Sequence, residues 1–317
     1  MGFLVLLLGA GCTQELDIIL PGKPVIIVYG VVSPDDSLHR IRVSRSASDK
    51  DVSWFQDAEV FLELRTSRGD VVERRQMNPD SPGVEIPGPG NSGKAVLYTC
   101  PSMQMQTGSP ENPATYALTL SVPRENLYVY GETHIPQEPF LILGDGLRRG
   151  TSLTVYPQND ENRIEILLPD LVWVEFHTLI HYTEFYKDSS VRKTIDYSRE
   201  YKAEVRNSGN RFDHFNFDAD WFINQILAHV KRDSFVTGRR LESIEFIQVH
   251  GTREFSEYRD SYSLSPDMGA TLYSNVTGGM GLFTASNTRK YSGFSLNAIS
   301  LDSLANGICT KRLLFKN

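Results

Sequence analysis

Apolar and polar residues alternate along most of the chain with the two-residue period of β-strands. Residues 24–32 are rich in β-branched side chains, and residues 39–45 alternate basic with apolar ones, as a strand with one solvated face does. Further strands are predicted at 58–65, 71–74, 95–100, 115–122 and 127–135, the first two forming a hairpin around 67–70. Short strands separated by turns predict an antiparallel β-sandwich over residues 23–143.

Proline and glycine divide this pattern. Residues 78–93 hold four prolines and four glycines, which predicts irregular backbone there. A second cluster of proline and glycine lies at 136–150, and we take it as the boundary between two domains. We therefore predict three parts, which are a signal and tether at 1–22, the sandwich at 23–143 and a β-rich domain at 144–317.

The third part adds two helices to long aromatic strands. Strands are predicted at 164–168, 171–185, 194–205 and 241–249. Asp218 or Asp220 can cap a helix near 220–232, whose apolar residues form one broad face. Phe255, Tyr258 and Tyr262 have the spacing of a second short helix near 252–262. The overall prediction is a mainly β protein with two short helices.

The N-terminal residues predict where the protein is located. Residues 3–8 form an apolar run too short to span a bilayer, followed by Gly9-Ala10-Gly11, Cys12 and a polar stretch. This order is typical of a secretory signal peptide, and a cysteine after small residues resembles a bacterial lipobox. We expect cleavage before Cys12 and lipid attachment to Cys12, although Gly9 stands where leucine is usual and no basic residue precedes the run.

The net charge bears on nucleic-acid binding, and the cysteine content bears on possible disulfides. The net charge is −7 and no basic block exceeds pairs such as Arg239-Arg240, which disfavours nucleic-acid binding. If Cys12 carries lipid, Cys100 and Cys309 remain, and two alternatives stay open. They form a disulfide between the two domains, or they are free thiols.

No residue pattern predicts catalysis, a metal or a cofactor. His177 and His181 have the spacing of a helical zinc motif, but on a strand that spacing covers about 13 Å, too far for one ion to bridge. There is no G-x-S-x-G turn for a serine nucleophile. Paired acids for glycoside hydrolysis are set by fold and not by spacing, so a surface hydrolase stays the alternative.

A glycine-rich motif lies near the end of the chain, at residues 273–283. Its candidate site residues are Asn275, Gly278, Gly279 and Gly281. A phosphate-binding loop would need G-x-G-x-x-G or a P-loop lysine, and neither is present. We interpret the motif as a tight turn where two backbones approach closely.

These segments together resemble a known family. The N-terminal residues 3–17, the strand 24–32 with Asp57-Ala58-Glu59-Val60, the stretch 116–136, the helix-like 253–262 and above all 273–283 look like an uncharacterised lipoprotein family of Bacteroidetes outer membranes, domain of unknown function 4249. The resemblance implies an N-terminal sandwich like the carboxypeptidase regulatory or transthyretin domain. Relatives often end in a Cys-rich tail, of which residues 309–312 are at most a remnant.

The resemblance also implies a place of action. Many members are encoded beside TonB-dependent transporters. We therefore expect a non-catalytic lipoprotein of the outer membrane, anchored by its N-terminal lipid on the periplasmic or the surface face. It would act as a binding or accessory module of a nutrient-uptake or envelope complex, with a TonB-dependent transporter as the expected partner. The alternative is a surface-anchored hydrolase of glycan or peptide.

Overall fold

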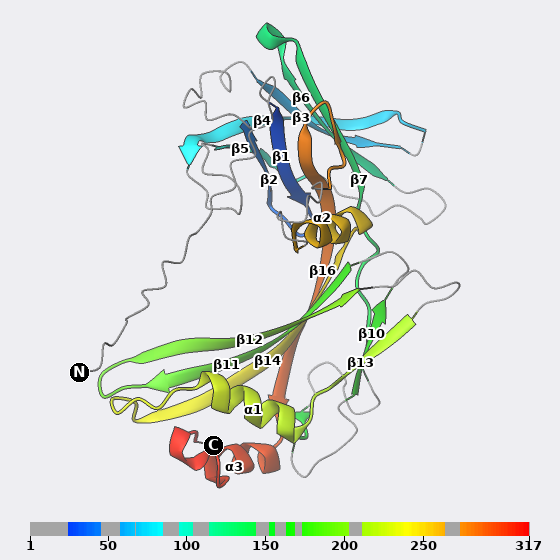
Figure 1. The fold of residues 1–317 in the computed structure, drawn as a ribbon. Coiled ribbons are helices and arrows are strands. Elements are labelled where there is room, and N and C mark those ends of the chain that lie inside the picture. The colour runs from blue at the N-terminus through cyan, green and yellow to red at the C-terminus, as the bar shows by residue number, and fades with distance from the viewer. Residues whose placement is uncertain are drawn as a thin grey trace, which may run out of the picture.

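One long strand, β16 (Met280–Leu296), runs through both lobes of the computed structural model (Figure 1). Its first half pairs with β1 (Ile26–Val32) of the first lobe, in parallel, from Ile27↔Met280 to Val32↔Ala285. Its second half pairs with β14 (Gly238–Gly251) of the second lobe. The structure describes residues 25–45, 58–66, 68–84, 95–103, 114–143, 152–155, 163–168, 173–202, 211–263 and 273–316.

The first lobe is the predicted sandwich-like unit. Besides β1 it contains β2 (Leu38–Arg45), β3 (Glu59–Arg65), β4 (Val71–Val84), β5 (Ala95–Pro101), β6 (Thr115–Val122), β7 (Leu127–His134), β15 (Val276–Thr277) and a short 3-10 helix (Pro123–Glu125). Its strands continue the large sheet in the order β16-β1-β2-β5-β4-β3-β6-β7-β15. The mainly β prediction is confirmed, but the parallel pairing of β1 with β16 makes this sheet mixed and not purely antiparallel.

Strand β4 corrects the prediction of irregular backbone from residue 78 onward. Its first half pairs with β3, up to Met77 opposite Val60, and its second half pairs with β5 through Pro79, Pro82 and Val84. The register shifts between Pro79 and Ser81 and again between Pro82 and Val84. Bulges accommodate proline, which cannot donate to a ladder, so two prolines do not end this strand. Residues 85–94 lie outside the described part of the chain.

The second lobe surrounds the far half of β16. Its elements are β8 (Leu141–Leu143), β9 (Ser152–Leu153), β10 (Arg163–Leu168), β11 (Trp173–Phe185), β12 (Ser190–Lys202), β13 (Arg211–Asn216), α1 (Ala219–His229), β14, α2 (Arg253–Ser263), α3 (Ala298–Asn306) and a 3-10 helix, η5 (Lys311–Leu313). Strands β12, β11, β14 and β16 are consecutive in the large sheet, and β13, β10 and β8 form a separate three-stranded sheet.

The described residues hold three α-helices where the sequence predicted two. Helix α1 begins as predicted, because the Asp218 side chain accepts a hydrogen bond from Trp221 N at 2.8 Å. Helix α2 lies within one residue of the predicted range. Helix α3 was missed, although Asn297 caps it by accepting from Ser300 N at 2.8 Å. At nine residues it is too short for its apolar spacing to stand out.

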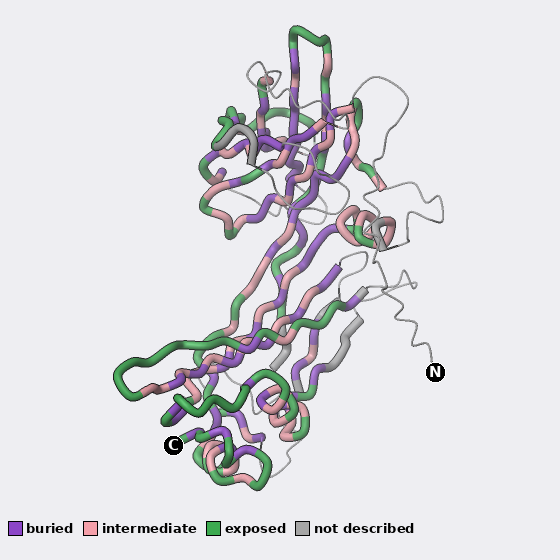
Figure 2. The backbone as a smooth tube through the Cα atoms, turned by 60° about the vertical axis from the view of Figure 1, so that its left-hand side comes forward, coloured by how far each residue is buried: buried purple, intermediate pink, exposed green. Residues whose placement is uncertain are grey.

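Two hydrophobic cores lie on either side of the lobe junction, and Figure 2 shows buried backbone concentrated in each lobe. The first core takes in Val276, Phe283 and Ala285, which follow the second lobe's other strands in sequence. The second core is built around Phe176, Phe246 and their aromatic neighbours. The other members of the first core lie between Ile26 and Ile135, and all members of the second core lie between Leu153 and Phe315.

Buried polar side chains join the two lobes at the segment after β7. His250 Nδ1 donates to the Gln137 carbonyl at 3.0 Å, and Asn287 Nδ2 donates to the Pro136 carbonyl at 3.0 Å. Because His250 Nδ1 must be the donor, its Nε2 accepts from Gln248 Nε2 at 2.9 Å in the neutral ring. Burial lowers the pKa of His250 from 6.5 to about 4, which agrees with this neutral tautomer.

Candidate functional site

The sheet of the second lobe has one packed face and one open face. Alternate residues of β11, including Val174, Phe176 and Ile180, belong to the second core. The residues between them point to the other side and are only half-buried. We call this other side the open face, which comprises Glu175, His177, Leu179, His181, Thr194, Asp196, Ser198, Glu200, Glu245, Ile247, Val249, Thr288 and Lys290.

Cross-strand pairs hold the two histidines of the open face. His177 Nδ1 lies 2.9 Å from Asp196 Oδ1 and its Nε2 lies 3.4 Å from Glu175 Oε1. His181 Nδ1 lies 2.9 Å from Thr194 Oγ1, and its Nε2 lies 3.5 Å from Glu245 Oε2. Each ring thus has its own partners. Within the described ranges, no group of three or more His, Cys, Asp or Glu side chains is placed to hold a metal ion.

Helix α2 covers the end of the open face at the lobe junction (Figure 1). Trp173 packs on Phe255 with ring centroids 4.8 Å apart, and Arg259 lies over the Trp173 ring while it pairs with Glu200. Tyr258 reaches Tyr29 of β1, at 6.0 Å between centroids. The helix therefore connects the first lobe to one end of the open face, and Thr194, Asp196 and Ser198 of that face are exposed.

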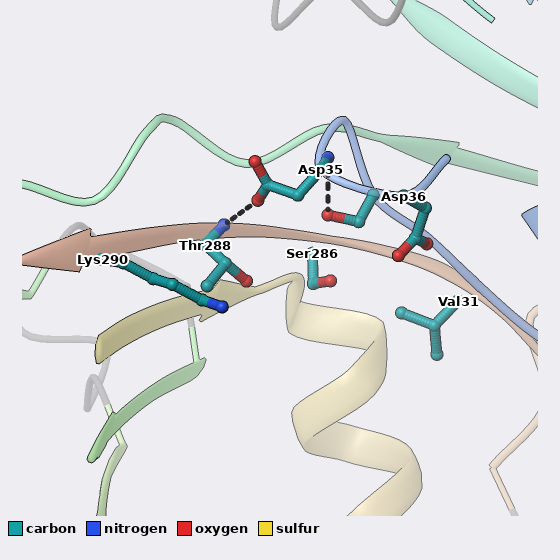
Figure 3. Close-up of a pocket in the computed structure, with 7 residues that line it drawn as sticks. Val31, Asp35, Asp36, Ser286, Thr288 and Lys290 are labelled. Atoms are coloured by element: carbon teal, nitrogen blue, oxygen red, sulfur yellow. Dashed lines mark hydrogen bonds between the residues drawn. The ribbon is translucent and has the colours of Figure 1, made fainter. Parts of the chain in front are cut away.

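Beside α2 the open face ends in an open pocket of about 680 Å³ between the lobes (Figure 3). Its lining comes from the turn after β1 and from β16, and comprises Val31, Ser33, Asp35, Asp36, Ser286, Thr288 and Lys290. Asp35 connects the two sides, because its Oδ2 accepts from Thr288 N at 3.2 Å while its own N donates to Ser33 Oγ at 3.3 Å.

The pocket offers both acceptors and donors to a polar ligand. Burial raises the pKa of the Asp36 carboxyl, with Arg40 opposing the shift and the neighbouring Asp35 adding to it. Opposite these acids stand the hydroxyls of Ser286 and Thr288 and the exposed ammonium of Lys290. In the sequence, residues 33–36 indicate only a turn, because nothing local shows that this turn meets residues 286–290 across the lobe junction.

The glycine motif lies in the first lobe, between β15 and β16. The chain leaves β15, which pairs with β7, and enters β16, which pairs with β1, so Gly278 and Gly279 turn the corner between the two ends of this lobe's sheet. Gly278 and Gly281 have φ of +74° and +115°. A β-carbon would collide with the Tyr128 carbonyl at Gly278 and with the Val28 carbonyl at Gly281, and would lie 2.8 Å from the Ile26 carbonyl at Gly279.

Asn275 fixes the same corner. Its Oδ1 accepts from Phe283 N at 2.9 Å, and its Nδ2 donates to Phe283 O at 2.6 Å. Ser274 Oγ accepts from Gly281 N at 3.0 Å. The side chains and backbone groups of the motif thus bind one another, which is the close backbone approach that the tight-turn interpretation describes.

The cysteines are not joined. Cys100 is buried in the first core and Cys309 is exposed after α3, and both are free thiols. Because β5 and α3 lie at opposite ends of the molecule (Figure 1), the disulfide alternative does not fit the structure. Cys12, the proposed lipid site, lies outside the described residues. None of the described helices has the length and apolar character to span a bilayer.

A family model described as a domain of unknown function, DUF4249, matches residues 13–292. The chain belongs to the DUF4249 family. The match covers both lobes, the open face, the pocket and the glycine corner, and it ends within β16. No curated protein matches this DUF4249 chain.

Solved structures give only distant similarity. Trypsin-activated α2-macroglobulin from Escherichia coli is 10% identical with a TM-score of 0.22, and the alignment covers 72% of this chain and 14% of that one. Elastase-activated E. coli α2-macroglobulin is 9% identical with a TM-score of 0.22, covering 86% and 20%. A cytokine receptor complex is 11% identical with a TM-score of 0.20, covering 86% and 99%. The DUF4249 chain thus spans a fifth or less of the two macroglobulins.

Proposed function

We propose that this DUF4249 protein is a non-catalytic lipoprotein of the outer membrane that binds a partner protein through the open face. The expected partner is a TonB-dependent transporter or another member of a nutrient-uptake or envelope complex. The observation that carries the proposal is the sheet with one packed and one open face. One solvated face is ordinary for antiparallel strands, but this one also places the apolar residues Leu179, Ile247 and Val249 among its polar groups.

The open face is preorganised for contact. His177 is held between Glu175 and Asp196, and His181 between Thr194 and Glu245, at the distances given above. Side chains that are already fixed lose less conformational entropy when a partner covers them. Leu179, Ile247 and Val249 lie among these polar groups on the neighbouring strands, so the face mixes apolar contact area with ordered hydrogen-bonding groups.

The N-terminus supports a membrane location. The apolar run, the small residues and Cys12 form the lipobox-like pattern, and 13 residues lie between Cys12 and β1 at Ile26. A fully extended segment of that length spans about 45 Å. A lipid on Cys12 would therefore hold the first lobe close to the membrane and leave the open face free for a neighbouring protein.

One observation favours the hydrolase alternative. The inter-lobe pocket contains two adjacent carboxyls, Asp35 and Asp36, and the pKa of Asp36 is raised by burial. A carboxyl with a raised pKa can donate a proton to a leaving group, as glycoside hydrolysis requires. A hydrolase built on this pocket would use Asp36 as the acid.

Affinity capture from detergent-solubilised membranes tests the proposal. The chain with Asp196→Lys and Glu245→Lys reverses two charges of the open face. The matched control carries Glu59→Lys and Asp70→Lys, which reverse two exposed charges of the first lobe. We expect a stoichiometric transporter with the native chain and the control, and its loss from the open-face variant.

Two outcomes contradict the proposal. Equal recovery of the partner by all three chains would remove the open face as the binding surface. Turnover of glycan or peptide by purified protein without any partner, abolished by Asp35→Asn or Asp36→Asn, would establish the hydrolase instead.

A further inference from the structure

The far end of the second lobe brings together two segments that are distant in sequence. We call residues 231–237 and 307–316 the C-terminal tip. Arg239 joins them, because its Nη1 donates to Leu313 O at 2.6 Å and its Nη2 donates to Lys231 O at 2.8 Å. Arg239 N also donates to Leu314 O at 2.8 Å, and Lys316 N donates to Arg239 O at 2.9 Å.

Large apolar side chains stand out from this tip. Phe235 is 77% exposed and Ile308 is 89% exposed, and Leu314 is 42% exposed. Phe235 and Leu314 have buried neighbours in the chain, since Val236, Leu313 and Phe315 are at most 5% exposed. Leu314 has a φ of +61°, a conformation that leucine rarely adopts, and lies between two residues whose side chains point into the core. Buried side chains such as Leu313 and Phe315 thus fix the tip, while its outer apolar residues are exposed to solvent.

The same segments are basic. Lys231, Arg232, Lys311 and Arg312 are all exposed, and none of them makes an ion pair with another described residue. Asp233 is the acid among them, and its carboxylate accepts from Phe235 N at 2.9 Å. With Lys316 the two segments contain five cations and one acid, whereas the whole chain carries a net charge of −7.

We propose that the C-terminal tip docks on an anionic lipid bilayer. Exposed Lys and Arg are attracted to lipid phosphates, and isolated apolar side chains between them can enter the boundary between headgroups and acyl chains. The tip's apolar residues stand on separate turns, after α1, after α3 and after η5. This arrangement fits a soft, negatively charged surface better than a shaped protein surface. The proposal is independent of the partner assigned to the open face.

The position of the tip determines how the protein would sit. Figure 1 places α3 and the C-terminus at the end of the molecule remote from the first lobe. β16 has 17 residues and rises about 3.3 Å per residue, so it extends about 56 Å from beside the start of β1 to Leu296, just before α3. The tether from Cys12 reaches about 45 Å. If lipid and tip touch the same bilayer, the long axis of the protein leans toward the membrane.

Vesicle co-sedimentation tests the proposal on the full chain carrying Cys12→Ser, so that no N-terminal lipid contributes. The probes are vesicles of phosphatidylcholine with phosphatidylglycerol and vesicles of phosphatidylcholine alone. We expect binding to the anionic vesicles and little to the neutral ones. Raising the salt from 0.1 M to 1 M should weaken binding, because the Debye length falls from about 10 Å to about 3 Å.

Matched variants locate the contact. Lys311→Ser with Arg312→Ser should weaken binding about 25-fold, at about fivefold per cation. Phe235→Ser with Ile308→Ser should weaken the binding that persists at high salt. The control is Arg68→Ser with Val72→Ser, an exposed cation and an exposed apolar residue of the first lobe. It should bind like the parent chain.

Each contrary result overturns the proposal. These are absence of binding to anionic vesicles, equal binding to both kinds of vesicle, and equal loss in the control variant. Unchanged binding after the tip substitutions would do the same. Retention of the tip variants on vesicles, with loss of a co-purified acidic protein, would show that the tip binds a protein instead. Melting temperatures of all variants, which alter only exposed side chains, should match the parent.

Discussion

The guanidinium of Arg239 lies against the carboxylate of Glu184, with Nε 2.9 Å and Nη2 2.8 Å from Oε1. Arg239 is 1% exposed and Glu184 is 7% exposed, so the pair joins β14 to β11 inside the lobe. The same guanidinium binds the carbonyls of Leu313 and Lys231. One side chain thus satisfies a buried acid and two separate backbone segments.

Arg239→Met should lower the free energy of unfolding by about 3–5 kcal/mol, because it leaves Glu184 charged, buried and unpaired. Urea denaturation measures the change. The double variant Arg239→Met with Glu184→Leu removes both charges and should recover part of the loss. Arg240→Met is the control, since Arg240 is exposed and pairs with Glu242 on the same strand, and it should shift stability by less than about 1 kcal/mol. If the single and double variants are equally unstable, the charge pair is not the cause.

Gly281→Ala should destabilise the protein more than Gly293→Ala. Both glycines belong to β16 and have positive φ, +115° and +89°, so alanine is strained at either position. A β-carbon at residue 281 would collide with the Val28 carbonyl, whereas nothing lies within 4 Å of one at residue 293. We expect an additional loss of about 1–3 kcal/mol at residue 281, measured by thermal or urea unfolding. Equal losses would mean that the glycine corner is not a point of close approach.

His250 should make the protein less stable in acid. Its pKa is about 4 in the folded state and 6.5 when unfolded, so between these values the unfolded chain binds more protons. Stability therefore falls as the pH drops from about 6.5 to about 4, by about 3 kcal/mol from this residue. His250→Gln cannot titrate, and its unfolding free energy should change less over the same range.

His39 contributes to the remaining pH dependence of that variant. Burial also lowers the pKa of His39, with Arg75 acting in the same direction, and this contributes with the same sign. The double variant with His39→Gln separates the two. If native protein and His250→Gln lose stability in parallel between pH 6.5 and pH 4, the assignment of His250 as a neutral, buried ring is wrong.

The two thiols should differ in reactivity. Cys309 is exposed, whereas Cys100 is 1% exposed and burial raises the pKa of its thiol. Because the thiolate is the reactive form, a thiol reagent should label Cys309 quickly in native protein and Cys100 only after unfolding. The Cys12→Ser chain without reductant gives one thiol before and two after denaturation. No reactive thiol in the denatured, unreduced chain would restore the disulfide alternative.

Local patterns could predict the elements but not their partners. The strand predicted at 115–122 and the Asp218 cap follow from neighbouring residues, and the structure has both. The proline-containing half of β4 was missed because the bulges that admit Pro79 and Pro82 depend on pairing with β5. Ile27 and Met280 pair although most of the chain lies between them, and the local alternation of apolar and polar residues cannot predict such a distant partner.

The candidate site was harder to predict for the same reason. Spacing indicated that His177 and His181 share a face, but it could not name Asp196 or Glu245 as their neighbours. The turn at Asp35 and the strand residue Thr288 meet only because the two lobes share β16. In the sequence Arg239-Arg240 is only a basic pair, and the position of the C-terminal segment explains why Arg239 is buried.

The shared strand also determines how the molecule would bear mechanical load. β1 begins at the N-terminal tether and runs parallel to β16 over six residue pairs, while the second lobe is attached to the opposite end of β16. A pull on the tether against that lobe drags the two strands past each other along their length. Such shear loads the whole ladder at once, whereas a pull across the strands would open it one bond at a time. The strand arrangement would therefore resist force most strongly in the direction in which a membrane anchor would apply it.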